Sequence, residues 1–174
     1  MIQRLFLAAA AALALAAPLA AARAEPTQRV ELTKMMGRWY EVARTPNVLQ
    51  NGCQAGASDW TPAPQGFAVV QSCHKGSPDG PVKEWKARAV VADPGANTRF
   101  RMSFFGGLVT QEYSVLECRP DQGWLILGTT NGRYVWLMSQ KPVLPAPVRA
   151  QAVARIRQLG FDPSRLEFPL PPRS

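Results

Sequence analysis

Short runs of alternating hydrophobic and polar residues dominate the middle of the chain, between residues 37 and 140. In residues 84–91, the charged positions 84, 86 and 88 alternate with Trp85, Ala87, Ala89 and Val91. Residues 99–104 repeat the pattern, with two arginines opposing two phenylalanines and a methionine. A period of two is typical of a β-strand that has one face in water and the other against an apolar interior. The pattern therefore predicts a β-sheet protein.

Eight such segments follow one another, separated by clusters of Gly, Pro, Asn and Asp. Asn131-Gly132, between two apolar runs, is a strong signal for a tight hairpin. Eight evenly spaced strands with no helix between them indicate an up-and-down antiparallel barrel or a sandwich. The predicted strands are Gly37–Arg44, Cys53–Thr61, Gly66–His74, Val82–Ala92, Thr98–Phe105, Gln111–Cys118, Gly123–Thr130 and Arg133–Gln140.

The last two predicted strands are apolar on both faces, so another element must cover their outside. Residues 145–159 begin with prolines and are followed by Gly160, as expected of a helix. Val148, Ala152, Ile156 and Leu159 fall on one face of that helix. We predict that it packs on the barrel wall; the alternative is a helix that docks on a membrane. Residues 165–168 are predicted to add a short strand before a proline-rich tail.

The N-terminus has the pattern of a signal peptide, residues 1–24. Arg4 precedes the apolar run Leu5–Leu19, and the small residues Ala22 and Ala24 mark cleavage before Glu25. The run is short for a membrane-spanning helix, which needs about 20 apolar residues, and a retained anchor is the alternative. No cysteine lies near the cleavage site. We therefore expect one soluble domain, residues 25–174, in the periplasm or secreted, without a lipid anchor.

The chain is basic, and loss of the leader lowers its formal net charge from +8 to +6. Lys and Arg occur singly along an exported chain, which argues against a nucleic-acid partner. The positive charge instead favours either transient contact with an anionic membrane surface or binding of an acidic amphiphile. The oligomeric state does not follow from the sequence.

Three cysteines make a disulfide feasible in an exported protein. Cys53 and Cys73 are equally distant from Ala63, which lies in a cluster of turn residues. A hairpin about that turn places the two cysteines opposite each other, close enough for a disulfide. We predict a Cys53–Cys73 bond and a free Cys118; the alternative is three reduced cysteines.

Blocks of sequence in matching order resemble the lipocalin family, in particular its bacterial and apolipoprotein D-like branch. The first is Lys34–Arg44, which contains Gly37-Arg38-Trp39 and continues through Pro46-Asn47 and Gly52-Cys53. The others are 103–106, 134–137 and 160–163. The resemblance implies an eight-stranded antiparallel up-and-down barrel, closed at one end by a 3₁₀ turn and flanked by one C-terminal α-helix.

The resemblance also implies structural roles for Gly37 and Trp39, with a cation packed over the tryptophan. The usual position of this cation holds Gln140, so Lys141 or another cation is expected to take the role. The lipidation cysteine of outer-membrane relatives is missing here.

An eight-stranded barrel encloses enough room for one small ligand. The family resemblance and the apolar inward face predict a carrier of a fatty acid, a lysophospholipid or a similar amphiphile, without a cofactor or metal. Gln71 and Tyr113 are the candidates to meet a polar head group. The predicted ligand-binding residues are Trp60, Val69, Gln71, Trp85, Ala87, Met102, Phe104, Tyr113 and Trp136; the other inward positions are Phe67, Ala89, Phe100, Val115 and Met138.

Two other functions are compatible with the sequence. A barrel that its own side chains fill would serve as an interaction module of the cell envelope, using the apolar loop Gly106–Val109. A lipid-modifying enzyme would need a nucleophile such as Cys118 beside His74, the single histidine. No paired acids, Gly-x-Ser-x-Gly motif or metal-ligand spacing supports catalysis, and we predict no enzyme activity.

Overall fold

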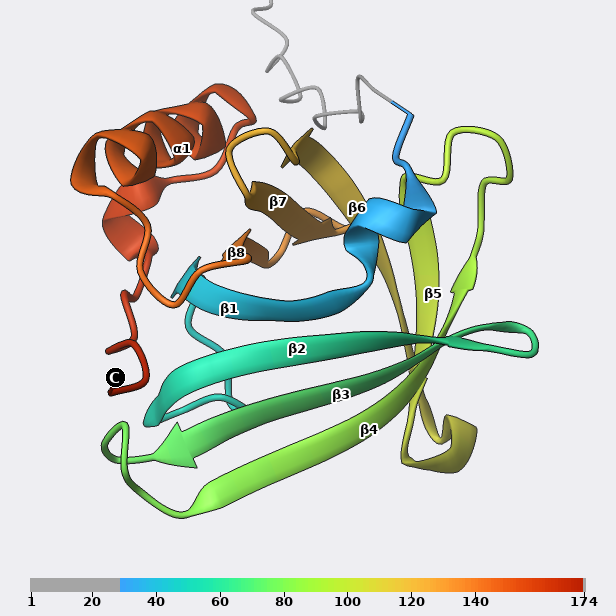
Figure 1. Ribbon diagram of the computed structural model, residues 1–174, viewed down its shortest axis with the longest axis horizontal. Coiled ribbons are helices and arrows are strands. Elements are labelled where there is room, and N and C mark those ends of the chain that lie inside the picture. Colours follow the sequence, from blue (N-terminus) through green and yellow to red (C-terminus); the bar gives the residue numbers. More distant parts are fainter. Residues whose placement is uncertain (1–28, 174) are drawn as a thin grey trace, which may run out of the picture.

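The computed structural model describes residues 29–173, so the predicted signal peptide lies outside the described residues. Eight antiparallel strands pair in chain order, and the last pairs with the first to close a barrel (Figure 1). The predicted barrel is confirmed, and the sandwich is excluded. The strands are β1 (Gly37–Arg44), β2 (Cys53–Ala63), β3 (Gly66–Lys75), β4 (Val82–Val91), β5 (Arg99–Phe104), β6 (Val109–Arg119), β7 (Trp124–Thr129) and β8 (Val135–Ser139).

The strand bounds match the sequence pattern within one or two residues, and β1 matches at both ends. β8 is the shortest strand and starts two residues later than predicted. Its first expected residues belong to the turn instead, because side chains bind their backbone: Arg133 N donates to Asn131 Oδ1 (3.0 Å) and Tyr134 N to Thr129 Oγ1 (3.1 Å). The Asn131-Gly132 hairpin itself is confirmed.

Helix α1 (Ala146–Gln158) packs on the outside of β7 and β8, as predicted (Figure 1). Its Ala152 and Ile156 are fully buried against Trp124, Ile126 and Leu137 of the two strands. This contact explains why β7 and β8 are apolar on both faces. Within residues 29–173, no helix is long and apolar enough to cross a membrane.

The segment after α1 does not form the strand predicted at residues 165–168. A 3₁₀ helix, η3 (Pro163–Arg165), is followed by a single antiparallel bridge between Glu167 and Arg44. A longer ladder is prevented because Pro169, Pro171 and Pro172 have no N–H to donate. The chain instead lies beside β2, where Ala55 N donates to Leu170 O (2.8 Å).

The barrel is closed at the end where β1 begins. The 3₁₀ helix η1 (Leu32–Met35) lies over this end, and the buried Trp39 donates from Nε1 to Met35 O (2.9 Å). Gly37 precedes this tryptophan with φ +91°, a conformation that favours glycine. Trp60, Phe67 and Phe100 pack with ring centroids 5.5–6.2 Å apart and fill the interior nearby.

Among the residues that the structure describes, no cation–π contact involves Trp39, where the family resemblance led us to expect one. Lys141 is exposed, and its backbone N donates to Ser139 Oγ (3.0 Å). Within residues 29–173, the cation–π contacts involve Trp85, Tyr134 and Phe168. The structure therefore corrects the role predicted for Lys141: the turn after β8 directs this side chain to solvent.

The predicted Cys53–Cys73 disulfide is confirmed, with a Cα–Cα distance of 5.4 Å, and Cys118 is free. The two cysteines do not face each other in register, however, since Cys53 pairs with Lys75. Two features shift the register: the turn lies at residues 63–66, and a bulge interrupts β2 between Gln54 and Ala57. The disulfide therefore runs diagonally between the strands.

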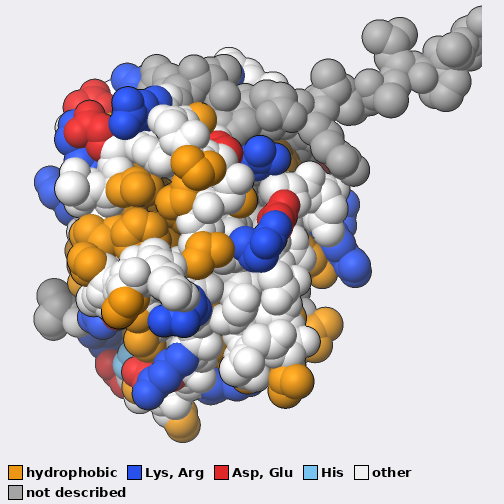
Figure 2. Space-filling model, turned by 90° about the vertical axis from the view of Figure 1, so that its right-hand side faces the viewer, with side chains coloured by type: hydrophobic (Ala, Val, Ile, Leu, Met, Phe, Trp, Pro, Cys, Tyr) orange, Lys and Arg blue, Asp and Glu red, His pale blue; other side chains and the backbone are white. Residues whose placement is uncertain are grey.

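Basic side chains outnumber acidic ones in the described domain. On the side of the barrel seen in Figure 2, Lys and Arg side chains lie scattered among hydrophobic ones, and Asp and Glu are sparse. The whole chain has 20 Lys and Arg against 12 Asp and Glu. On this face, the scattered charges make no continuous track for a nucleic-acid backbone.

Candidate functional site

A cavity of about 280 Å³ occupies the barrel and opens at the end opposite η1. The loops at this open end are residues 45–52, 76–81, 105–108 and 130–134, which we call the mouth loops. Trp39, Trp60, Leu125 and Met138 line the deeper part. The remaining lining residues are Met35, Glu41, Asn47, Val48, Leu49, Gln50, Ala57, Ser58, Gln71, Trp85, Phe104, Phe105, Val109, Gln111, Tyr113, Leu127, Thr129, Tyr134 and Trp136.

Most of the ligand-binding residues predicted from the sequence line this cavity, namely Trp60, Gln71, Trp85, Phe104, Tyr113 and Trp136. Val69, Ala87 and Met102 do not. Val69 and Met102 are fully buried among side chains that fill the barrel toward its closed end. The period of two identifies the inward face of a strand, but it does not give the depth at which the packed core ends and the cavity begins.

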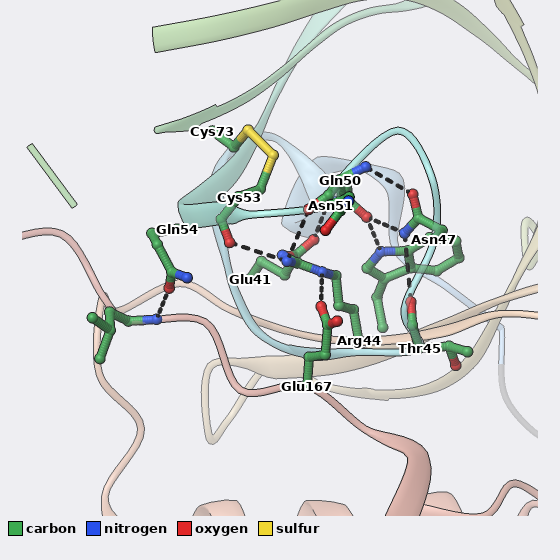
Figure 3. A network of polar contacts seen from close by, with 12 residues as sticks. Glu41, Arg44, Thr45, Asn47, Gln50, Asn51, Cys53, Gln54, Cys73 and Glu167 are labelled. Atoms are coloured by element: carbon green, nitrogen blue, oxygen red, sulfur yellow. Dashed lines mark hydrogen bonds and ion pairs between the residues drawn. A yellow bond between two sulfur atoms is a disulfide. The ribbon is translucent and has the colours of Figure 1, made fainter. Parts of the chain in front are cut away.

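The first mouth loop supplies cavity residues that the sequence pattern missed. Asn47, Val48, Leu49 and Gln50 all line the cavity, although they lie between two strands. Gln50 fixes the loop (Figure 3): its Oε1 accepts from Asn47 Nδ2 (2.7 Å) and Trp136 Nε1 (3.0 Å). A loop residue thus positions an aromatic side chain of β8 in the cavity wall.

A buried ion pair at the end of β1 supports the same loop (Figure 3). The guanidinium of Arg44 donates to Glu41 through Nη1 and to Glu167 through Nε (3.0 Å). Its Nη2 donates to the backbone carbonyls of Gln50 (3.1 Å) and Cys53 (3.0 Å). Because Arg44 binds both ends of the loop's last turn, the ion pair fixes the loop to the barrel.

Glu41 connects the ion pair to the cavity. Its side chain is buried, lines the cavity, and accepts at Oε2 from Gln50 Nε2 (2.5 Å). Burial raises the pKa of Glu41, while the attraction of Arg44 opposes this rise. Glu41 is the one carboxylic acid among the described lining residues, which include no Lys, Arg or His.

Comparison with known proteins decides the family. Residues 30–171, most of the chain, match the family model of the lipocalin-like domain. The chain belongs to the lipocalin-like family. The predicted family and the predicted barrel with its single flanking helix are thereby confirmed, and the protein binds a small lipophilic ligand.

Curated relatives of this lipocalin come from bacteria and plants. It is 25% identical over 145 residues to the outer membrane lipoprotein Blc of Vibrio cholerae, covering 83% of this chain and 84% of that protein. It is 26% identical over 151 residues to temperature-induced lipocalin-1 of Arabidopsis thaliana, covering 82% and 80%. Blc proteins are envelope proteins by name, which agrees with an envelope location for this lipocalin.

Solved structures show the same fold at lower identity. Insecticyanin of the tobacco hornworm Manduca sexta has a TM-score of 0.66 at 17% identity, covering 83% of this lipocalin and 82% of that chain. Lobster apocrustacyanin A1 has a TM-score of 0.65 at 14% identity, covering 81% and 79%.

The arrangement of this lipocalin does not support the nucleophile considered from the sequence. His74 lies near the mouth end of β3, with Nδ1 3.1 Å from Gly80 O, whereas Cys118 lies near the closed end of β6. Burial and the neighbouring Glu117 raise the pKa of Cys118, which disfavours a thiolate. Within residues 29–173, no group of three or more His, Cys, Asp or Glu is placed to hold a metal. Lipocalins are in general ligand carriers rather than enzymes.

Tyr113 gives the cavity a spectroscopic probe. Its ring lies 5.8 Å from that of Trp136, and burial raises the pKa of Tyr113 to about 12. The unfolded chain ionises this phenol near its ordinary pKa of about 10. The folded state therefore loses stability as the pH rises from about 10 to about 12, by up to about 3 kcal/mol.

We expect denaturant unfolding to show this loss in the wild type between about pH 9 and about pH 12, and to show much less of it in Tyr113→Phe. Tyrosinate absorbance should lose its most alkaline transition in the same variant. An equal loss of stability in both proteins would show that Tyr113 is not shielded from water.

Proposed function

We propose that this lipocalin carries one single-chain amphiphile, such as a fatty acid or a lysophospholipid, with its tail in the barrel and its head at the mouth. The observation that carries the proposal is the cavity of about 280 Å³ with aromatic and aliphatic walls. Ligand pockets commonly measure about 300–1,000 Å³, so this one is at the small end. A single chain suits it better than a two-chain phospholipid.

The polar lining supports this orientation. An ionised head inside the cavity would meet Glu41 but no cation of the lining. At the rim, Lys83 follows Val82 at the start of β4, on the same face as Trp85, and its Nζ lies 4.9 Å from the Trp85 ring centroid. An anionic head is therefore better placed outside, near Lys83, than among the buried side chains.

The expected affinity follows from burial of the tail. Each buried methylene contributes about 0.8 kcal/mol, which gives a palmitoyl chain a gross term on the order of 10 kcal/mol. Loss of freedom on association removes several kcal/mol of this. A micromolar Kd is the reasonable outcome.

Intrinsic fluorescence can test the proposal, because four of the five tryptophans line the cavity: Trp39, Trp60, Trp85 and Trp136. We expect saturable titration by palmitate and by palmitoyl lysophosphatidylcholine. The lauroyl analogue, four methylenes shorter, should bind more weakly by up to about 100-fold, and glycerophosphocholine, which has no tail, should not bind. Absence of binding by every tailed amphiphile would refute the proposal.

We place the site of action in the cell envelope, where the signal-peptide pattern directs the chain and where the named Blc relatives reside. We also propose that the protein acts without a lipid anchor. Among the described residues, Cys53 and Cys73 are buried and bonded to each other, and Cys118 lies within β6. Mass spectrometry of the mature protein tests this, since an acylated N-terminus would contradict it.

A further inference from the structure

Large hydrophobic side chains are exposed mainly around the mouth of the cavity. Of the nine large hydrophobic side chains that are exposed within residues 29–173, six lie on or beside three mouth loops that are far apart in the sequence. Val48 and Leu108 are the extreme cases, with 92% and 87% of their surface exposed. We call the six residues the apolar rim; they are Val48, Leu49, Val82, Phe105, Leu108 and Val109.

The backbone of Phe105 provides a second, independent observation. This residue has φ +52°, in the left-handed region that a bulky side chain rarely adopts. Gly106 and Gly107 follow it with positive φ, yet the aromatic residue occupies the first position of the turn, half exposed and lining the cavity. Asparagine or glycine would fit this conformation at lower cost. The phenylalanine ring lies 6.4 Å from that of Phe104, and half of its surface still faces solvent at the mouth.

Cations surround the same opening. Lys75 ends β3 and Lys83 is the second residue of β4, while Arg133 lies over the ring of Tyr134, with Cζ 5.2 Å from the ring centroid. Within residues 29–173, none of these three has a carboxylate partner. Two carboxylates near this end have cationic partners: Asp79 pairs with Arg173 (2.9 Å), and Glu167 pairs with Arg44 (3.0 Å), which it shares with Glu41.

We propose that the mouth of the barrel docks on an anionic membrane surface, with the apolar rim entering the interface and the three cations contacting lipid head groups. Exposed apolar side chains ringed by basic ones match both components of such a surface. A face-to-face contact between two copies would instead bring like charges together. The inference goes beyond ligand carriage and rests on it in one respect: a docked mouth lets a lipid tail pass between membrane and cavity without crossing water.

Vesicle flotation tests the docking with a variant outside the cavity wall. Val82 and Leu108 are exposed and do not line the cavity, so Val82→Ser/Leu108→Ser removes rim contacts and leaves the ligand walls intact. We expect the wild type to float with vesicles of phosphatidylcholine mixed with phosphatidylglycerol. The double variant should bind them at least about tenfold more weakly, while titration with palmitoyl lysophosphatidylcholine in solution stays unchanged.

Matched variants separate docking from folding. Val143→Ser removes an exposed valine between β8 and α1 and should leave flotation unchanged. Lys83→Gln should weaken binding to the anionic vesicles by about fivefold, with little effect on phosphatidylcholine alone. Phe105→Asn should weaken flotation without lowering the unfolding midpoint, because asparagine tolerates the left-handed backbone.

Three results would overturn the docking proposal. The wild type and Val82→Ser/Leu108→Ser could float equally well, or the wild type could bind vesicles equally well with and without phosphatidylglycerol. The third is that the double substitution alters the oligomeric state of the protein but not its binding to vesicles. If the wild type showed no saturable binding of palmitoyl lysophosphatidylcholine in solution, the carrier function would be refuted instead. The two failures are therefore distinguishable.

Discussion

Replacing Arg44 with methionine is expected to lower the free energy of unfolding by about 3–5 kcal/mol. The substitution leaves Glu41 buried without its cation and removes the donor to the carbonyls of Gln50 and Cys53. An unpaired charge in such a place is costly, so the pKa of Glu41 should rise further and the carboxyl should take up a proton. Denaturant unfolding measured on the wild type and the variant gives the difference.

Three companion variants show whether the cost arises from the buried charge. Glu41→Gln/Arg44→Met should be more stable than Arg44→Met, because the unpaired charge is removed with its partner. Glu167→Gln changes a half-exposed partner and should cost less than about 1 kcal/mol. Arg38→Met breaks the exposed ion pair with Asp59 and should also lower the free energy of unfolding by less than about 1 kcal/mol. A cost for Arg44→Met no larger than that for Arg38→Met would contradict this account.

Filling the cavity is expected to abolish useful ligand binding while the barrel stays folded. Leu127 of β7 lines the cavity and is only partly buried, so Leu127→Trp adds bulk where the tail should lie. Excluding about four methylenes from the cavity costs about 3 kcal/mol, which weakens binding by about 100-fold. Fluorescence titration with palmitoyl lysophosphatidylcholine measures the loss.

Val70→Trp is the matched control, because Val70 lies on β3 between two inward residues and points away from the cavity. It adds the same bulk to the outer face and should leave the Kd unchanged. If Leu127→Trp binds the ligand as the wild type does, the tail does not occupy this cavity.

The strands and their order were predictable because each depends on local pattern. β1 was placed at both ends by its alternation and its glycine start, and the hairpin before β8 by Asn131-Gly132. The helix over β7 and β8 was predictable because a strand that is apolar on both faces needs a cover. These inferences need no knowledge of distant contacts.

The candidate site was predictable only in part, because depth and loop position depend on contacts distant in sequence. Val69, Ala87 and Met102 lie on the inward faces of their strands, as predicted, but the aromatic side chains around them fill the barrel at that depth. Gln50 enters the wall through bonds to Glu41 and Trp136, which no local pattern encodes. The available signal was Glu41 itself, an acid on a strand whose inward face is otherwise apolar.

The disulfide shows how a correct pairing can rest on an approximate geometry. Symmetry about Ala63 suggested directly opposed cysteines, whereas the turn and the bulge in β2 offset Cys53 from Cys73 by two residues along β3. A diagonal neighbour on the same face remains within bonding reach. The disulfide was predicted correctly because both cysteines lie on the same face of the sheet, although the predicted register between β2 and β3 was wrong.

Native mass spectrometry of the protein purified from the envelope of its own host tests the central claim most directly, followed by extraction and identification of any bound molecule. The account predicts one single-chain amphiphile per barrel, present in the wild type and lost from Leu127→Trp. A barrel that is empty and also ignores added fatty acids and lysophospholipids would contradict carriage, and would favour an interaction module built on the same frame.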